Sequence, residues 1–244
     1  MNVLCACEES QAVCKAFREK GHNAYSCDIQ PCSGGHPEWH IMGDVLPILN
    51  GRCRFHTMDG VWHEMAGKWD LIIAHPPCTC LTVTGNRWFN VERYGEKAIQ
   101  RHKDREQAIA FFMAFANADC TRIAIENPIC IMSSVYRKPD QIIQPWQFAL
   151  TDEEKTEKTT CLWEKGVPAL KALHEKKPEL AYHEWINPDG KKKRQTLWYY
   201  NTRCLPHSKR AKAASKTFPG IAMAMAEQWG NVDSFPEQLS MFEL

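Results

Sequence analysis

The sequence predicts an α/β fold built on a doubly wound, Rossmann-like sheet with a small irregular insertion. Short apolar segments alternate with helical segments in the first half of the chain, which is typical of parallel sheets. Residues 70–74 (DLIIA) are apolar without alternation, as expected of a strand buried on both faces. The chain has 244 residues, of which 44% are hydrophobic and 24% charged, enough for one such domain with an appendage.

The first strand is expected over residues 2–7, which form a short apolar segment. A helix over 11–20 follows, with Ser10 as a plausible N-cap. A second strand over 24–27 ends at Asp28. Ligands of doubly wound sheets bind at the carboxyl ends of such strands, so we expect Asp28 at the ligand-binding edge.

The central strand over 70–74 must stop where two prolines follow, because proline cannot extend the hydrogen-bonded ladder. A long helix is expected from about residue 96 to 118. Another strand, over 122–125, ends at Asn127–Pro128. This pattern brings the residues after both strands to one edge of the sheet.

From Arg137 onward the pattern loosens, because prolines interrupt short apolar segments. Residues 183–186 and 195–200 are expected to form a hairpin around a turn at 187–190. A final helix over 218–229 is expected to pack through three apolar residues, Ile221, Met225 and Trp229.

The twelve cysteines do not indicate a metal site, because no C-x-x-C spacing occurs. His36 and His40 lie in a proline- and glycine-containing segment, which favours an ordinary loop over a metal site. The first residues show neither a basic region nor a long apolar core, and no segment is suited to span a bilayer. We therefore expect a cytoplasmic protein with reduced thiols, no metal and no membrane contact.

A candidate nucleophile stands at the end of the central strand. Cys78 directly follows Pro76–Pro77, and Glu126 ends the next strand along the chain. A thiol and a carboxyl group are what addition to a pyrimidine requires: the thiolate adds to C6, and the carboxyl group contacts N3. The alternative is that Cys78 is one of several buried thiols and Glu126 a surface carboxylate.

These motifs resemble those of DNA cytosine-C5 methyltransferases, particularly short and divergent phage and bacterial members. His75-Pro-Pro-Cys78 resembles the nucleophile motif, and Glu126-Asn-Pro128 resembles the Glu-Asn-Val motif. The resemblance implies S-adenosylmethionine as cofactor and DNA as substrate. The catalytic residues that it implies are Pro77, Cys78, Glu126 and Asn127.

The same resemblance implies a cofactor site. It assigns Asp28 to the ribose hydroxyls and Asp44 to the adenine amine, and it brings the 217–222 segment back to the cofactor. The expected cofactor-binding residues are Cys5, Ala6, Cys7, Asp28, Asp44, Pro76 and Phe218. The first loop departs from the family because it lacks glycine and carries Glu8 and Glu9. These carboxylates would repel the cofactor's own carboxylate unless they point away, for example towards the next helix.

Two regions are expected to contact DNA. Arg87 and Trp88 follow the nucleophile and can close over a flipped base; the alternative is a loop anchored by a buried tryptophan. Residues 190–226 contain nine Lys or Arg and no Asp or Glu, so the rest of the chain has 21 basic against 29 acidic residues. Lys193, Arg194 and Arg203 are the candidate contacts in this segment. The alternative is a solvated basic face.

The last residues contain a candidate partner motif. Gln238, Leu239, Met241 and Phe242 resemble the pentapeptide that docks on the bacterial β sliding clamp. The alternative is packing of Leu239 and Phe242 on the body. The expected organisation is a catalytic core over 1–136, an insertion over 137–214, a helix returning to the core over 215–231 and a mobile tail over 232–244.

Taken together, the motifs predict S-adenosylmethionine-dependent methylation of cytosine C5 in DNA. Thymidylate synthases also carry Pro-Pro-Cys, normally followed by His, whereas Thr79 follows here. Amino-methyltransferases share the fold but have an aromatic residue where Cys78 stands. A catalytically inactive DNA-binding or clamp-associated module is the third alternative, favoured by the glycine-free loop.

Overall fold

The computed structural model describes residues 1–231. The strands are β1 (Asn2–Ala6), β2 (Asn23–Asp28), β3 (His40–Met42), β4 (Cys53–His56), β5 (Trp62–Met65), β6 (Leu71–Ala74), β7 (Ile123–Asn127), β8 (Gln141–Ile143), β9 (Thr160–Lys165), β10 (Tyr182–Ile186) and β11 (Lys192–Thr196). The α-helices are α1 (Ala12–Glu19), α2 (Val91–Tyr94), α3 (Glu96–Ala116), α4 (Met132–Val135), α5 (Leu197–Cys204), α6 (His207–Ser215) and α7 (Pro219–Trp229). The 3₁₀ helices are η1 (Pro37–Trp39), η2 (Leu46–Ile48), η3 (Val83–Phe89), η4 (Pro145–Phe148) and η5 (Asp152–Glu154).

A seven-stranded sheet in the order β3-β2-β1-β6-β7-β9-β8 forms the centre of the molecule. The five strands from β3 to β7 are parallel, and β9 runs antiparallel to both of its neighbours. The expected α/β class with a mostly parallel sheet is confirmed, and the strand order is compatible with a Rossmann-like fold. β8 and β9 belong to this sheet, so the sheet continues beyond residue 136.

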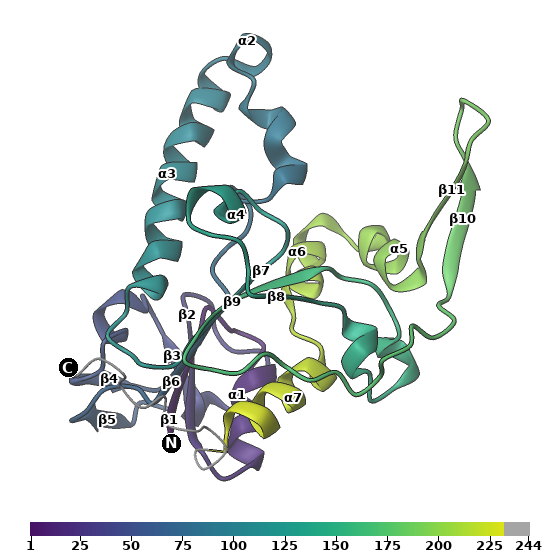
Figure 1. Cartoon of the computed structure of the whole chain (residues 1–244). Coiled ribbons are helices and arrows are strands. Elements are labelled where there is room, and N and C mark those ends of the chain that lie inside the picture. The colour runs from purple at the N-terminus through teal and green to yellow at the C-terminus, as the bar shows by residue number, and fades with distance from the viewer. Residues whose placement is uncertain (232–244) are drawn as a thin grey trace, which may run out of the picture.

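Helices cover both faces of the sheet (Figure 1). α1 and α7 pack on one face, where α7 buries Ile221, Met225 and Trp229 as expected. α3 packs on the other face through Phe112 and Phe115. All four residues of β6 are fully buried, which explains the apolar run without alternation: neighbouring side chains face opposite helical layers.

Two arms project from the sheet (Figure 1). One is formed by η3, α2 and the first turns of α3, and the other by the β10–β11 hairpin with α5 at its base. Both rise on the side opposite to the N-terminus of β1, which is the side where the parallel strands end. Within residues 1–231, no helix is both long and apolar enough to cross a membrane.

The largest differences from the predicted boundaries lie at the hairpin and at the start of the first helix. The second hairpin strand runs over Lys192–Thr196 rather than 195–200, and residues 197–200 are helical. Strand pairing runs out there because Thr196 is opposite Tyr182, the first residue of β10. The N-cap of α1 is Gln11 rather than Ser10, since the carboxylate of Glu8 accepts the free amides of the first turn. Gln238, Leu239, Met241 and Phe242, the proposed clamp motif, lie outside the described residues.

Candidate active site at the carboxyl edge of the sheet

Cys78 and Glu126 follow two adjacent strands. β6 pairs with β7 in parallel, with Ala74 opposite Ile125, so both strands end at the same edge. Burial raises the pKa of the Cys78 thiol, and the negative charge of Glu126 at the same edge raises it further. The structure therefore brings together the thiol and the carboxyl group that the sequence singled out.

Glu126 is held by a histidine from the neighbouring strand end. His75 Nδ1 lies 3.1 Å from Glu126 Oε2, and the side chains of His75 and Glu126 are 9% and 12% exposed. Burial by itself raises the pKa of Glu126. The hydrogen bond from His75 and the charge of Lys158 outweigh burial, so the pKa of Glu126 lies below its ordinary value. Glu126 is therefore a carboxylate at neutral pH, not the surface carboxylate of the alternative interpretation.

Cys78 has the opposite protonation state. Burial and the charge of Glu126 raise the pKa of its thiol, whereas the charge of Lys158 lowers it. The net shift is upward, so sulfur keeps its proton at neutral pH. The amides of Leu81 and Thr82 both donate to the Cys78 carbonyl, which closes a turn directly after the nucleophile.

Asn127 fixes the backbone that precedes Cys78. Its Nδ2 donates to the carbonyl oxygen of Pro76 over 2.7 Å, and its side chain is buried. Pro76 is buried as well, whereas Pro77 is exposed. Asn127 thus connects β7 to the Pro-Pro turn and positions Cys78.

The expected cofactor acids lie at the same edge, on the other side of β1. Asp28 ends β2, and its carbonyl accepts the amide of Gly43 next to Asp44. Burial and the charges of Asp28 and Asp44 raise the pKa of Cys7. Burial also raises the pKa of Asp28, although the Gln30 amide donates to its Oδ1 over 2.9 Å and opposes the shift. Cys7, Asp28 and Asp44 therefore surround one region beyond the ends of β1 and β2.

The glycine-free loop adopts a conformation that usually requires glycine. Cys7 has φ 58° and Gln11 has φ 59°, both in the left-handed region. The Glu8 carboxylate accepts the amides of Val13 and Cys14 at 2.6 and 3.1 Å, and Glu9 forms an ion pair with Lys212 at 3.0 Å. Glu8 therefore points towards the N-terminus of the next helix, which is one of the orientations that the sequence analysis considered.

The other expected cofactor residues differ in their access to a ligand. The side chains of Cys5 and Ala6 are fully buried within β1, so only the backbone there is able to approach a ligand. Phe218 is the N-cap of α7, and its ring lies 6.0 Å from Lys158 Nζ. Because Lys158 acts electrostatically on Cys78 and Glu126, Phe218 belongs to the same edge.

Arg87 and Trp88 lie in η3, in the first arm. Trp88 is 42% exposed, so the alternative of a loop anchored by a buried tryptophan is wrong. The buried anchor is Phe89, on which Arg101 and Arg105 of α3 pack. Arg87 lies over the Trp88 ring at 4.6 Å, leaving a cationic and aromatic surface open to solvent.

Lys193, Arg194 and Arg203 lie in the second arm, on β11 and α5. Lys193 and Arg194 are exposed neighbours on β11, so their side chains point to opposite faces. Arg194 packs on the Tyr182 ring at 4.5 Å. Arg203 comes from α5, at the base of the hairpin.

Sequence reasoning gave no separate role to four residues that interact with Cys78, Glu126 or the segment after Cys78. They are His75, Arg101, Arg105 and Lys158. The position of His75 beside Pro76 was a usable signal, because a strand-end histidine stands at the ligand edge. Arg101 Nη2 donates to the Thr79 carbonyl, and Arg105 Nε donates to the Cys80 carbonyl at 2.8 Å. No local pattern marks Lys158 or these two arginines.

Comparison with models of known protein families gives no match, and comparison with curated protein sequences gives no significant relative. Among residues 1–231, no group of three His, Cys, Asp or Glu side chains is arranged to hold a metal ion.

Proposed function

We propose that the protein transfers a methyl group from S-adenosylmethionine to C5 of cytosine in DNA. The observation that supports this most directly is the electrostatically coupled pair Cys78 and Glu126 at one sheet edge, with Asp28 and Asp44 at the same edge on the other side of β1. This arrangement suits a reaction with two bound ligands. Cys78 and Glu126 would act on one ligand, and the separate acidic region would hold the other.

The protonation states of the pair suit addition to a pyrimidine. In the resting protein the Cys78 sulfur carries a proton and the Glu126 carboxylate does not, because the pKa of Cys78 is raised and that of Glu126 is lowered. Addition requires sulfur to lose that proton and N3 to gain one. Passing the proton from Cys78 through Glu126 to N3 leaves a thiolate that bonds to C6 and a carboxylate facing a protonated N3. The C5 atom then becomes nucleophilic.

The surrounding residues act on this pair. His75 orients Glu126, and the buried amide of Asn127 fixes the Pro76 carbonyl and thus the approach of sulfur. Lys158 stabilises the thiolate by its charge as sulfur loses its proton. After methyl transfer, loss of the C5 proton restores the ring double bond and expels sulfur.

The described residues fit the cofactor. When bound, S-adenosylmethionine supplies an electrophilic methyl group. Asp28 and Asp44 offer oxygen acceptors suited to ribose hydroxyls and an exocyclic amine, and Phe218 offers an aromatic edge. Glu8 is directed into α1, so its charge does not oppose the carboxylate of the cofactor. The left-handed backbone at Cys7 gives the close approach for which glycine is commonly used.

DNA as substrate is supported by the charge of the two arms. β11 and α5 of the second arm lie in the 190–226 segment, which has nine Lys or Arg and no acid. A base in duplex DNA must leave the stack before C6 is accessible to a thiol. Trp88 and Arg87 stand exposed on the segment that follows Cys78, where they can contact such a base.

A trapping experiment tests this proposal. The protein is incubated with S-adenosylmethionine and duplex DNA that contains 5-fluorocytosine, and adducts are resolved by denaturing electrophoresis and mass spectrometry. Fluorine at C5 prevents the final proton loss, so the bond from Cys78 to C6 persists. We expect an adduct with wild type and with Cys80→Ser, none with Cys78→Ser, and formation slowed roughly 100-fold in Glu126→Gln.

Two outcomes contradict the proposal. If wild type binds both ligands but forms no adduct, the C5 mechanism is wrong for this protein. If an adduct forms with the mononucleotide and not with DNA, the activity resembles that of a thymidylate synthase instead.

A further inference from the structure

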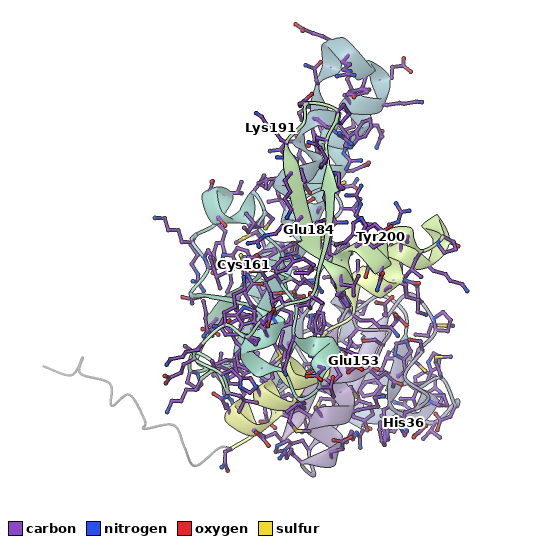
Figure 2. The ribbon with its side chains drawn as sticks, turned by 90° about the vertical axis from the view of Figure 1, so that its right-hand side faces the viewer. His36, Glu153, Cys161, Glu184, Lys191 and Tyr200 are labelled. Carbon is purple, nitrogen blue, oxygen red and sulfur yellow. The ribbon has the colours of Figure 1, made fainter. Side chains whose placement is uncertain are left out.

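A second candidate site lies in the arm formed by the β10–β11 hairpin and α5. It is a hollow of about 390 Å³, within the range of small-molecule sites. The residues that line it are His183, Trp185, Gln195, Tyr200, Arg203 and Cys204. Figure 2 shows Lys191 at the tip of this hairpin, Glu184 midway along it and Tyr200 at its base.

Strand alternation separates the two faces of the hairpin. His183 and Trp185 are two residues apart on β10, and Gln195 is opposite His183 on β11, so all three share one face. Glu184 lies on the other face, where it forms an ion pair with Lys192 at 2.7 Å. Consequently, the lining of the hollow, as far as the described residues form it, contains no carboxylate.

The rings of this face are stacked. His183 and Tyr200 are nearly parallel, with ring centroids 3.6 Å apart and an interplanar angle of 17°. Trp185 is inclined by 23° to His183 at 6.0 Å. Its Nε1 donates to Asn187 Oδ1 over 3.0 Å, which fixes the indole, yet the residue is 37% exposed. Flat rings held in roughly parallel planes offer stacking surfaces to another planar group.

Charge selects among planar ligands. Aromatic rings alone also suit an organic cation, but Arg203 lines the hollow and Lys193 is opposite Trp185 in the strand pairing. These positive charges disfavour a cation and favour a ligand that carries an anionic group next to its flat ring. Gln195 adds an amide that both donates and accepts hydrogen bonds, as the edge of a nucleobase requires.

We propose, resting on DNA as the substrate of the proposed function, that this hollow binds an unstacked nucleobase of a single-stranded segment, with Arg203 at the adjoining phosphate. The base stacks on Trp185 and meets Gln195 with its edge. The site is separate from the catalytic edge, because it is built entirely from β10, β11 and α5.

The test measures binding of a fluorescein-labelled ten-nucleotide thymidine oligonucleotide by anisotropy, without cofactor. Trp185→Ala is compared with Ile186→Ala, its exposed neighbour on the opposite face of the same strand. We expect Trp185→Ala to weaken binding at least tenfold and Ile186→Ala to leave it within twofold. Trp185→Phe retains a stacking ring and is expected to recover most of the affinity. Thermal unfolding of each variant confirms that the hairpin remains folded.

The site is refuted if Trp185→Ala and Ile186→Ala bind alike, or if wild type does not bind the oligonucleotide. Equal losses for single-stranded and duplex DNA indicate contact with the backbone alone and also overturn base capture. The adduct experiment on Cys78 is independent of this measurement. If the adduct forms normally and Trp185→Ala binds the oligonucleotide like wild type, only the proposed base binding in the hollow is refuted. If the affinity depends on Trp185 but no adduct forms, only the proposed methyl transfer is refuted.

Discussion

His75 Nδ1 lies 3.1 Å from Glu126 Oε2, between two strand ends from which solvent is nearly excluded. Glu126 is thereby kept ionised in a place where burial alone would neutralise it. Burial raises the pKa of Glu8, and the charge of His75 opposes this shift across the ends of β1 and β6. The histidine therefore connects the edge that carries Cys78 with the loop after β1, where we propose that the cofactor binds.

Replacing His75 should change how stability depends on pH. In wild type the pKa of Glu126 is depressed, so its contribution is present above the unfolded pKa of about 4.3 and is lost as pH falls. In His75→Gln burial prevails, and protonation of Glu126 becomes favourable. We expect a loss of about 2 kcal/mol in unfolding free energy at pH 7 and a smaller loss at pH 5, measured by urea unfolding. Equal losses at both pH values would contradict this role; exposed His56→Gln is the control.

Lys158→Met should make Cys78 less reactive. The ammonium group lowers the pKa of the Cys78 thiol, against the larger effects of burial and Glu126. Without it the pKa rises and the thiolate fraction falls, so we expect alkylation by iodoacetamide at pH 8 to slow about three- to tenfold. Mass spectrometry of the Cys78 peptide gives the rate. Lys155→Met, an exposed lysine of the preceding segment, should leave it unchanged; an equal effect of both variants would exclude a specific role of Lys158.

Cys7 should tolerate glycine but not a β-branched residue. Its φ of 58° is left-handed, and this region costs non-glycine residues about 1–2 kcal/mol. Cys7→Gly removes that cost but increases the conformational entropy of the unfolded chain and loses some packing, so we expect stability within about 1 kcal/mol of wild type. Cys7→Val should destabilise by about 2 kcal/mol. Denaturant unfolding measures both, with Cys32→Val as control, and a Val variant as stable as the Gly variant would show that the loop relaxes.

Glu164 on β9 should make the protein less stable in mild alkali. Burial and the neighbouring Asp140 raise its pKa to about 7 from an ordinary 4.5, against the opposing charge of Arg137. Because the pKa of Glu164 is higher in the folded than in the unfolded protein, its contribution to stability is complete below the pKa of the unfolded state. This contribution is lost as pH rises through the folded-state pKa of about 7. We expect Glu164→Gln to raise Tm by about 2–4 °C at pH 8, after allowance for screening, and by less at pH 5. An increase independent of pH would point to packing instead; exposed Glu175→Gln is the control.

The elements that could be predicted from sequence are those set by local pattern. The apolar run over 70–74 and the prolines after it define β6 and its end, and Asp28 marks the end of β2. Parallel pairing then places Cys78 and Glu126 at one edge, because adjacent parallel strands end together. The final helix could also be located from a local pattern, the spacing of its apolar residues.

Features that depend on long-range packing could not be predicted. β9 contributes an antiparallel strand beside β7 although it lies beyond residue 136, and its neighbours in sequence give no sign of that pairing. The chain after Thr196 contains aromatic residues that suit a strand, yet it turns into α5 once β10 offers no partner. Lys158 approaches Cys78 and Glu126 only through the folded path of the chain.

The ion pair between Lys212 and Glu9 joins the basic segment to the loop next to Cys7. α6, which carries Lys212, follows directly after the aromatic hollow of the second arm. A shift of α6 on binding of a polyanion to the arm would separate Lys212 from Glu9. The nearly buried Glu9 carboxylate, in the loop next to Cys7, would then lose its ion-pair partner. If the arm and the region around Cys7 bind their proposed ligands, thermodynamic linkage requires each ligand to change the affinity of the other by the same factor. The order of binding would then change the free energy of each step and leave the total unchanged.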